Sequence, residues 1–233
     1  MGATLIRTLP LRVAPIAGEA LDSWLEAIAA RYNVPLSDVI KRCGMQTTGR
    51  ATSTLLSPSH DEIIRISAAT GIGIAVIEAM TWQRYPTHPA DAKQSRYLLW
   101  LRHVGSRYCP QCLRGSHGRW PLAWRLNWTF ACVRHRCLLA DSCFACGTAQ
   151  RQQPLCASRI PRLGRCPAAC YRQTANTRAE CNADLGAANV LRMLQTHPVL
   201  SAQATIDALL DGNPPAFALY GGATPQDAAV LEQ

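Results

Sequence analysis

The spacing of cysteine and histidine residues constrains this chain more than any other feature. Cys109 and Cys112 lie in YCPQC, and Cys132 and His135 lie in ACVRH, which gives the array C-x2-C-x19-C-x2-H. A two-residue spacer lets one tight turn direct both donor atoms at a single ion, and two such turns supply a tetrahedral site. We therefore predict that these four residues bind zinc, rather than acting as free thiols or a redox pair.

A second set of cysteines follows shortly after the first. It begins with Cys143 and Cys146 in CFACG. The residues that complete it stay open at this point, because four more cysteines are available: Cys156, Cys166, Cys170 and Cys181. The CPAAC stretch could supply two of them, since some zinc turns tolerate a three-residue spacer. We expect a second zinc ion, and hence two ions per chain.

The cysteine content also bears on the compartment. The chain has eleven cysteines, an odd number, and Arg7 and Arg12 interrupt the only apolar stretch near the N-terminus, unlike a secretory signal. No run of eighteen uncharged apolar residues occurs, so we expect no membrane span. Closely paired cysteines then indicate metal sites in a reducing, cytoplasmic protein. We expect Cys43 and Cys137 to be small buried hydrophobic residues rather than ligands.

Positive charge is concentrated in the middle of the chain. Residues 92–181 contain fifteen Lys or Arg residues against only Asp141 and Glu180, whereas residues 1–91 are balanced and residues 182–233 are net acidic. Thiolates bound to zinc would leave the middle strongly basic. Such a segment suits a polyanion or an acidic partner surface, and we expect it to bind DNA weakly, with strong salt dependence.

Three parts are expected along the chain: a helical domain over 1–91, a tandem zinc-binding module over 92–183, and a C-terminal helical segment over 184–233. The fold class is mainly α with small β zinc ribbons. In the stretch 19–33, apolar residues recur at helical spacing, and Asp22 and Glu26 take the other face. We therefore predict an amphipathic helix there.

Shorter helices complete the predicted N-terminal part. One covers 37–43 with Ser37 as its N-cap, and another follows the capping box that Ser59 and Glu62 form. Gly71 ends that helix, and a further helix is predicted over 74–80. The last two helices, joined by a brief turn, resemble a helix-turn-helix. Such a unit can read DNA, but any small bundle that docks on a protein shows the same pattern.

Three tryptophans recur every four residues in the middle of the chain, at Trp120, Trp124 and Trp128. We interpret them as a helical stripe that packs the ribbons onto the helical part, with base stacking as the alternative.

The C-terminal part predicts two helices, over 187–195 and over 201–212, the second with Ser201 as its N-cap. The stretch 224–233 begins another helix, which ends after barely two turns. This ending indicates a truncated chain or a frayed terminus.

Three stretches, taken in order, resemble the TniQ family of bacterial transposition proteins, which includes the TnsD-type target selectors: LPLRVAPIAGEALDSWLEAIAARYNV, RYCPQCLRGSHGRWPLAWRLNWTFACVRHRCLLADSCFACG and CNADL. The resemblance implies zinc ligands at Cys109, Cys112, Cys132 and His135, and at Cys143 and Cys146. The family usually ends its second ribbon with CxxCGADL, where this chain has RAECNADL. Cys181 matches the final cysteine, and Arg178 replaces its partner. We therefore expect Cys166 with Cys181 to complete the second site, and Cys170 is the alternative.

The resemblance also implies a function. Family members have a helix-turn-helix-like domain followed by zinc ribbons, and act as adaptors between a target, either DNA or a guide-RNA effector complex, and an AAA+ ATPase. We expect no catalysis, because four protein ligands leave zinc no position for water and no HExxH motif occurs. A DNA-binding transcriptional regulator is the alternative, ahead of a metalloenzyme. Whether the chain forms a homodimer stays open.

Overall fold

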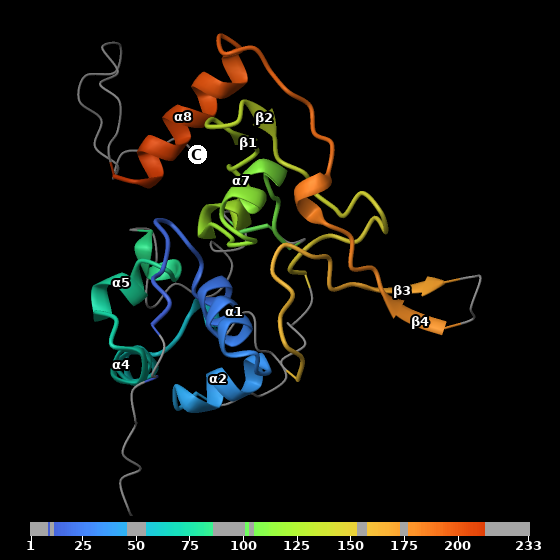
Figure 1. Ribbon diagram of the computed structural model, residues 1–233. Helices are drawn as coiled ribbons and strands as arrows, with labels where there is room; N and C mark the ends of the chain where they lie inside the picture. Colours follow the sequence, from blue (N-terminus) through green and yellow to red (C-terminus); the bar gives the residue numbers. More distant parts are fainter. Residues whose placement is uncertain are drawn as a thin grey trace, which may run out of the picture.

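The computed structural model describes residue 9 and residues 12–45, 55–85, 101–102, 105–152, 158–172 and 177–212. Its N-terminal helices lie together on one side, the cysteine-rich segments lie beside them, and a β-hairpin extends away from both (Figure 1). The helix predicted over 224–233, the boundary predicted after residue 91, and Cys156 lie outside the described residues. None of the described helices is long and apolar enough to cross a membrane.

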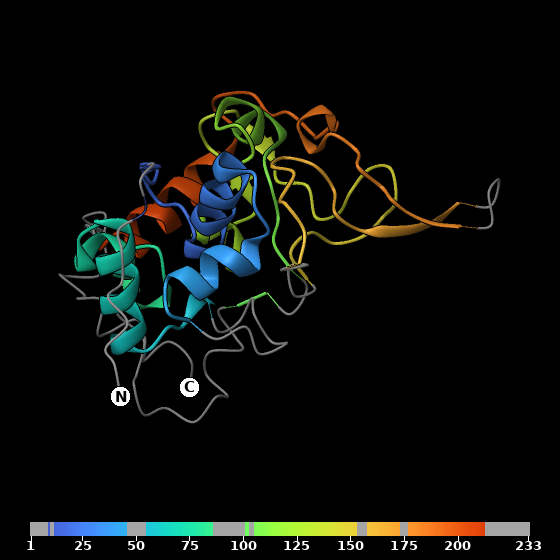
Figure 2. The ribbon, with the colours of Figure 1, turned by 60° about the horizontal axis from the view of Figure 1, so that its bottom comes forward.

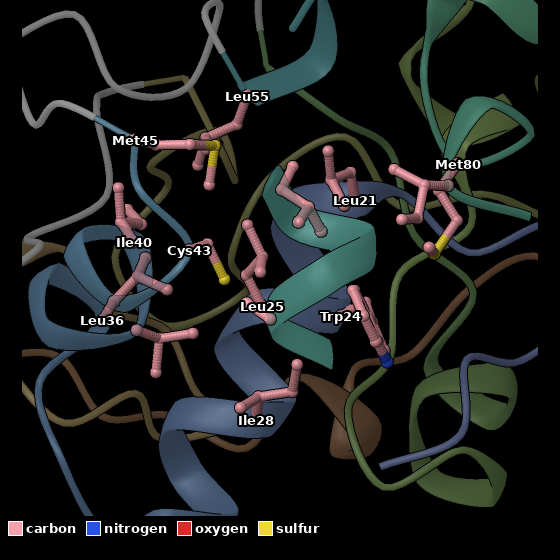
Figure 3. Close-up of a cluster of buried hydrophobic side chains, with 14 of the residues drawn as sticks. Leu21, Trp24, Leu25, Ile28, Leu36, Ile40, Cys43, Met45, Leu55 and Met80 are labelled. Carbon is pink, nitrogen blue, oxygen red and sulfur yellow. The ribbon is translucent and has the colours of Figure 1, made fainter. Parts of the chain in front are cut away.

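The N-terminal part is built on α1 (Leu21–Tyr32), which packs against α2 (Leu36–Arg42), α4 (His60–Thr70) and α5 (Ile74–Glu78). Leu21, Trp24, Leu25 and Ile28 of α1 are buried in one hydrophobic cluster with side chains of α2 and α4 (Figure 3). These are residues whose helical spacing predicts a core face. The amphipathic helix expected from the sequence is therefore present.

The predicted capping box of α4 is confirmed. The Ser59 hydroxyl accepts a hydrogen bond from the backbone N–H of Glu62, and the Glu62 carboxylate accepts one from the N–H of Ser59 at 2.8 Å. Gly71 ends the helix at φ 72°, a left-handed conformation that glycine adopts without strain. The turn 71–73 then leads into α5, which ends at Glu78, two residues earlier than expected.

The predicted N-cap of α2 is wrong, because Pro35 occupies that position and Ser37 lies within the first turn. Proline has no N–H, and its ring fixes φ, so the chain enters the helix directly from Pro35.

The central part contains short elements held in place by long-range contacts. They are α7 (Pro110–Gly115), η2 (Leu122–Arg125), the β1–β2 pair (Ala131–Cys132 with Cys137–Leu138) and the β3–β4 pair (Ala169–Arg172 with Thr177–Glu180). Both pairs are antiparallel. Figure 2 shows the β3–β4 hairpin extending away from the helices. The short 3-10 helices η1 (Trp82–Arg84) and η3 (Leu185–Ala187) complete the described elements.

The tryptophans do not form a helical stripe. Trp120 precedes η2, Trp124 lies within it, and their rings meet edge to face with centroids 5.7 Å apart. The Trp120 backbone also joins the helical part, since its N–H donates to the Ser23 hydroxyl at 2.8 Å. Trp128, by contrast, is 49% exposed. The expected packing role therefore belongs to Trp120 and Trp124, and not to a stripe of three.

The helix predicted over 187–195 is also wrong. Arg192 pairs with Cys137 in an antiparallel bridge, and the N–H of Met193 donates to the carbonyl of Arg136 at 2.7 Å. This segment extends the β1–β2 pair, because the exposed edge of a hairpin offers backbone partners that local periodicity does not reveal.

The final described helix, α8 (Pro198–Leu210), begins three residues before the predicted start. His197 is its N-cap in place of Ser201, and Pro198 occupies the first helical position, which suits proline. The Gln203 side chain of α8 accepts hydrogen bonds from the backbone N–H groups of Phe130 and Ala131. The C-terminal part therefore packs on the first ribbon.

Candidate metal centres

Two short segments bring the first predicted donor set together. Pro110 starts α7 directly after Cys109, so Cys109 and Cys112 stand about one helical turn apart. Cys132 ends β1, and His135 lies in the turn that leads into β2. The turn closes through Arg136, whose φ of 52° lies in the left-handed region. Four potential ligands thus come from two compact turns, as the spacing predicts.

The donor atoms of this first donor group have the geometry of a metal site. The Nδ1 atom of His135 lies 3.4 Å from the sulfur of Cys109, 3.1 Å from that of Cys112 and 3.5 Å from that of Cys132. The sulfurs of Cys112 and Cys132 are 3.6 Å apart. A zinc tetrahedron with ordinary Zn–S and Zn–N bond lengths has edges of about 3.5 to 3.8 Å. The four residues therefore could hold a zinc ion, with Nδ1 as the histidine donor.

The second donor group contains Cys143, Cys146, Cys166 and Cys181, whose sulfurs all lie within 4.8 Å of one another. The sulfurs of Cys143 and Cys181 are 3.8 Å apart, and those of Cys146 and Cys166 are 3.6 Å apart. Both distances are close to an S–S edge of about 3.8 Å in a zinc tetrahedron. This is the set expected for the second site, and metal binding by it stays a prediction.

Backbone pairing explains how Cys166 and Cys181 meet across fourteen intervening residues. The N–H of Cys166 donates to the carbonyl of Ala183 at 2.9 Å, and the N–H of Cys181 donates to that of Ala168 at 2.8 Å. The β3–β4 pair continues this ladder outward from the donor group. Cys170 stands in β3 opposite Ala179, further along the hairpin, and its side chain lies outside the described part.

The remaining described cysteines differ in position. Cys43 lies in the N-terminal hydrophobic cluster, where burial raises the pKa of its thiol to about 12, as suits a small hydrophobic residue. Cys137 is also buried, but its sulfur lies 3.7 Å from that of Cys109, beside the first donor group and outside the set of four. Sequence reasoning missed this proximity. The signal that could have found it is the tight hairpin that pairs Cys132 with Cys137.

The electrostatics of the first donor group favour a thiolate. Hydrogen bonds from Cys112, then from Cys132 and Cys137, hold the pKa of the Cys109 thiol far below its ordinary value. A thiolate is the form that binds metal.

A buried ionic cluster joins α1 to the segments that carry the donors. Glu19, Asp22 and Glu26 are all buried, and they pair with Arg119, Arg125 and Arg151. The sequence pattern assigns Asp22 and Glu26 to the polar face of an amphipathic helix. In the structure this face contacts the central part instead of solvent, because the three arginines neutralise it there.

The two carboxylates that share Arg151 differ in their compensation. Burial alone would raise the pKa of Asp22, but the charges of Arg125 and Arg151 outweigh it and hold that pKa below its ordinary value. Burial raises the pKa of Glu26 to about 7, against the attraction of Arg151 and with the help of the charge on Asp22. Arg151 also stacks over the Trp120 ring, 4.8 Å from its centroid. Glu26 is thus the least compensated charge of the cluster.

Comparison with known proteins places these features in one family. The sequence model of the TniQ family matches residues 10–139, which is more than half of the chain. The match includes α1 and all four residues of the first donor group, and it ends before Cys143. None of the curated proteins matches the sequence.

Proposed function

The chain belongs to the TniQ family, which indicates a role related to transposition, and from this premise we propose that it is a non-catalytic, zinc-binding adaptor. In this proposal the protein links a recognised target, either DNA or a guide-RNA effector complex, to the AAA+ ATPase of a transposition system. Its place is the cytoplasm, where thiolate ligands stay reduced.

The observation that carries the proposal is the closure of both donor groups. Each has four protein donors at the edges of a tetrahedron, so each would bind one zinc ion and leave it no open position for water. Zinc bound in this way stabilises a scaffold and does not catalyse hydrolysis. Cys109, Cys112, Cys132 and His135 would hold one ion, and the four cysteines of the second donor group would hold the other.

The ionic cluster supports a scaffold of defined geometry. Arg119 follows α7, and Arg151 follows the turn that contains Cys143 and Cys146, yet both reach the acidic residues of α1. An adaptor must keep its target-binding surface and its partner-binding surface in a fixed relation. Buried charge pairs of this kind penalise any separation of the parts, because each separated charge would lose its partner.

The α4–α5 unit favours protein contact over DNA reading. The α5 helix spans only five residues, Ile74–Glu78, and none of them is basic. Ile74 and Val76 are 38% and 45% exposed. A recognition helix needs donors for phosphates and base edges, which this one lacks. We therefore assign DNA contact to the arginines of the central part, and the ATPase is the partner for the helical part.

A pull-down tests the proposal. The tagged, zinc-loaded chain is incubated with the AAA+ ATPase encoded beside it, with and without target DNA. We expect the ATPase to be retained, and more of it with DNA. The variant Cys132→Ser should lose retention, and Cys170→Ser is its matched control. Failure to retain the ATPase in both conditions, together with tight binding to one DNA sequence, would indicate a transcriptional regulator instead.

A further inference from the structure

A cavity of ≈ 590 Å³ lies beside the first donor group. The turn between Cys132 and Cys137 contributes Arg134 and Arg136 to its wall, and the start of α8 contributes Thr196, His197 and Ser201. No acidic residue lines it. The cavity therefore combines two guanidinium groups with hydroxyl donors, and nothing in its wall repels an anion.

The two arginines differ from most arginines of the central part. Among the residues that the structure describes, neither Arg134 nor Arg136 has an ion-pair partner, and both are exposed. The arginines that do pair with an acid are Arg102, Arg107, Arg119, Arg125, Arg151, Arg159 and Arg165. The cavity thus holds positive charge that the described fold leaves uncompensated.

The start of α8 is itself already capped. The Nδ1 atom of His197 accepts the N–H of Val199 at 3.3 Å, so the site does not depend on free helix N–H groups. Ser201 and Thr196 are exposed, and their hydroxyls are free to donate to an oxyanion. Arg192, which pairs with Cys137 at the edge of the hairpin, is a further exposed arginine close to the cavity.

We propose that this cavity, which we call the Arg134–Arg136 pocket, binds a backbone phosphate of duplex DNA. The inference rests on the proposed function, since it names where the adaptor contacts its target. Guanidinium groups match phosphate oxygens in bidentate geometry. A duplex is favoured over an acidic protein because the neighbouring chain adds only further positive charge, at Arg192, and a repeating row of phosphates can reach all three arginines.

Zinc binding and phosphate binding are linked in this pocket. Arg134 lies between the two ligands Cys132 and His135, and Arg136 follows directly. Metal in the first donor group would fix the turn that presents both guanidinium groups. Loss of that metal would release them, so removal of zinc also weakens DNA binding.

The backbone of Arg136 allows folding and binding to be separated. Its φ of 52° is in the left-handed region, which favours glycine. Arg136→Gly therefore removes a guanidinium group and relieves the backbone at the same time. A loss of DNA binding in this variant, without a loss of thermal stability, is not a folding defect.

The test measures binding of a short duplex of arbitrary sequence to the zinc-loaded full chain by fluorescence anisotropy, over a series of salt concentrations. The double variant R134A/R136G should bind roughly tenfold more weakly at low salt, and the slope of log affinity against log salt should fall by about 1.8, or 0.9 for each lost phosphate contact. The matched control is K41A/R42A, which removes the same charge from the exposed end of α2. It should bind within about twofold of wild type.

Four results would overturn the proposal: wild type that does not bind the duplex, R134A/R136G that binds like wild type, K41A/R42A that loses as much affinity, or poly-glutamate that binds more tightly than the duplex in an arginine-dependent way. The last result would assign the pocket to an acidic protein surface. Retention of the ATPase by R134A/R136G without DNA reports on the adaptor function separately. Retention beside a failed DNA test would leave the proposed function standing.

Discussion

The two donor groups offer the same ligand geometry but are assembled in different ways. The first comes from two compact turns within 109–135, lies inside the segment that matches the TniQ family, and packs with the buried residues Tyr108, Leu113 and Trp120. The second spans 143–181, lies outside that segment, and is closed at the base of the projecting β3–β4 hairpin (Figure 2). One donor group is therefore a part of the molecule's core, and the other closes a long loop.

The largest effect is expected from loss of the first donor group. Cys132→Ser should abolish zinc binding there and unfold the central part, because structural zinc contributes about 10 to 16 kcal/mol of apparent binding free energy at neutral pH. Zinc analysis and near-UV circular dichroism measure the outcome. A variant that keeps its tertiary signal would show that the first donor group is dispensable for the core.

Loss of the second donor group should be milder. Cys181→Ser should remove one zinc equivalent and release the β3–β4 hairpin while α1 and the first donor group stay folded, since their contacts lie elsewhere. Metal content and hydrogen exchange of the 166–181 segment measure this. Cys170→Ser is the control and should keep two zinc equivalents. If the control loses zinc as well, the assignment of Cys181 as the final ligand needs revision.

The ionic cluster connects the two regions to α1, and Arg151 is its shared cation. Arg151→Met would leave Glu26 without an arginine partner and Asp22 with one, at a cost of about 3 to 5 kcal/mol, as for other broken buried pairs. Chemical denaturation measures the free energy of unfolding. Arg159→Met breaks the exposed pair with Glu180 and should cost less than about 1 kcal/mol. Equal costs for the two variants would contradict the role given to the cluster.

The raised pKa of Glu26 predicts a pH dependence. With a pKa of about 7 in the fold against an ordinary value of 4.5, the folded state holds this proton more tightly than the unfolded chain does. Its contribution therefore stabilises the fold at low pH and is lost as pH rises from about 4.5 to 7. The lowered pKa of Asp22 acts in the opposite direction, below pH 3.8, and so lies outside this window.

Glu26→Gln isolates this contribution. The variant should gain about 1 to 3 kcal/mol of stability relative to wild type between pH 5 and about pH 7.5. Thiolate ligands favour the opposite trend, since metal binding strengthens as pH rises, but that effect is common to both proteins and cancels in the difference. A difference that stays constant with pH would show that Glu26 keeps an ordinary pKa.

The smallest effect is expected far from both donor groups. Ser59→Ala removes the capping box of α4 and should lower the free energy of unfolding by about 1 kcal/mol, with zinc content unchanged. Ser57→Ala, an exposed serine outside the capping box, is the control and should be neutral. Loss of zinc in Ser59→Ala would indicate that the helical and zinc-binding parts unfold together.

The sequence by itself determined the features that depend on neighbouring residues. The first donor group follows from two-residue spacers, the capping box from Ser59 and Glu62, and the core face of α1 from its apolar period. These features need only one turn or one helix to form, so their physical cause is contained in a short stretch of chain.

Only the tertiary structure decided the features that join distant segments. It paired Cys166 with Cys181 through a backbone ladder, buried Asp22 and Glu26 against arginines more than a hundred residues away, and made residues near Arg192 a strand rather than a helix. Local propensity is weak beside such contacts, because a buried charge or an unpaired backbone group costs more than a helical preference gains. Which segments supply the partners is a property of the whole fold.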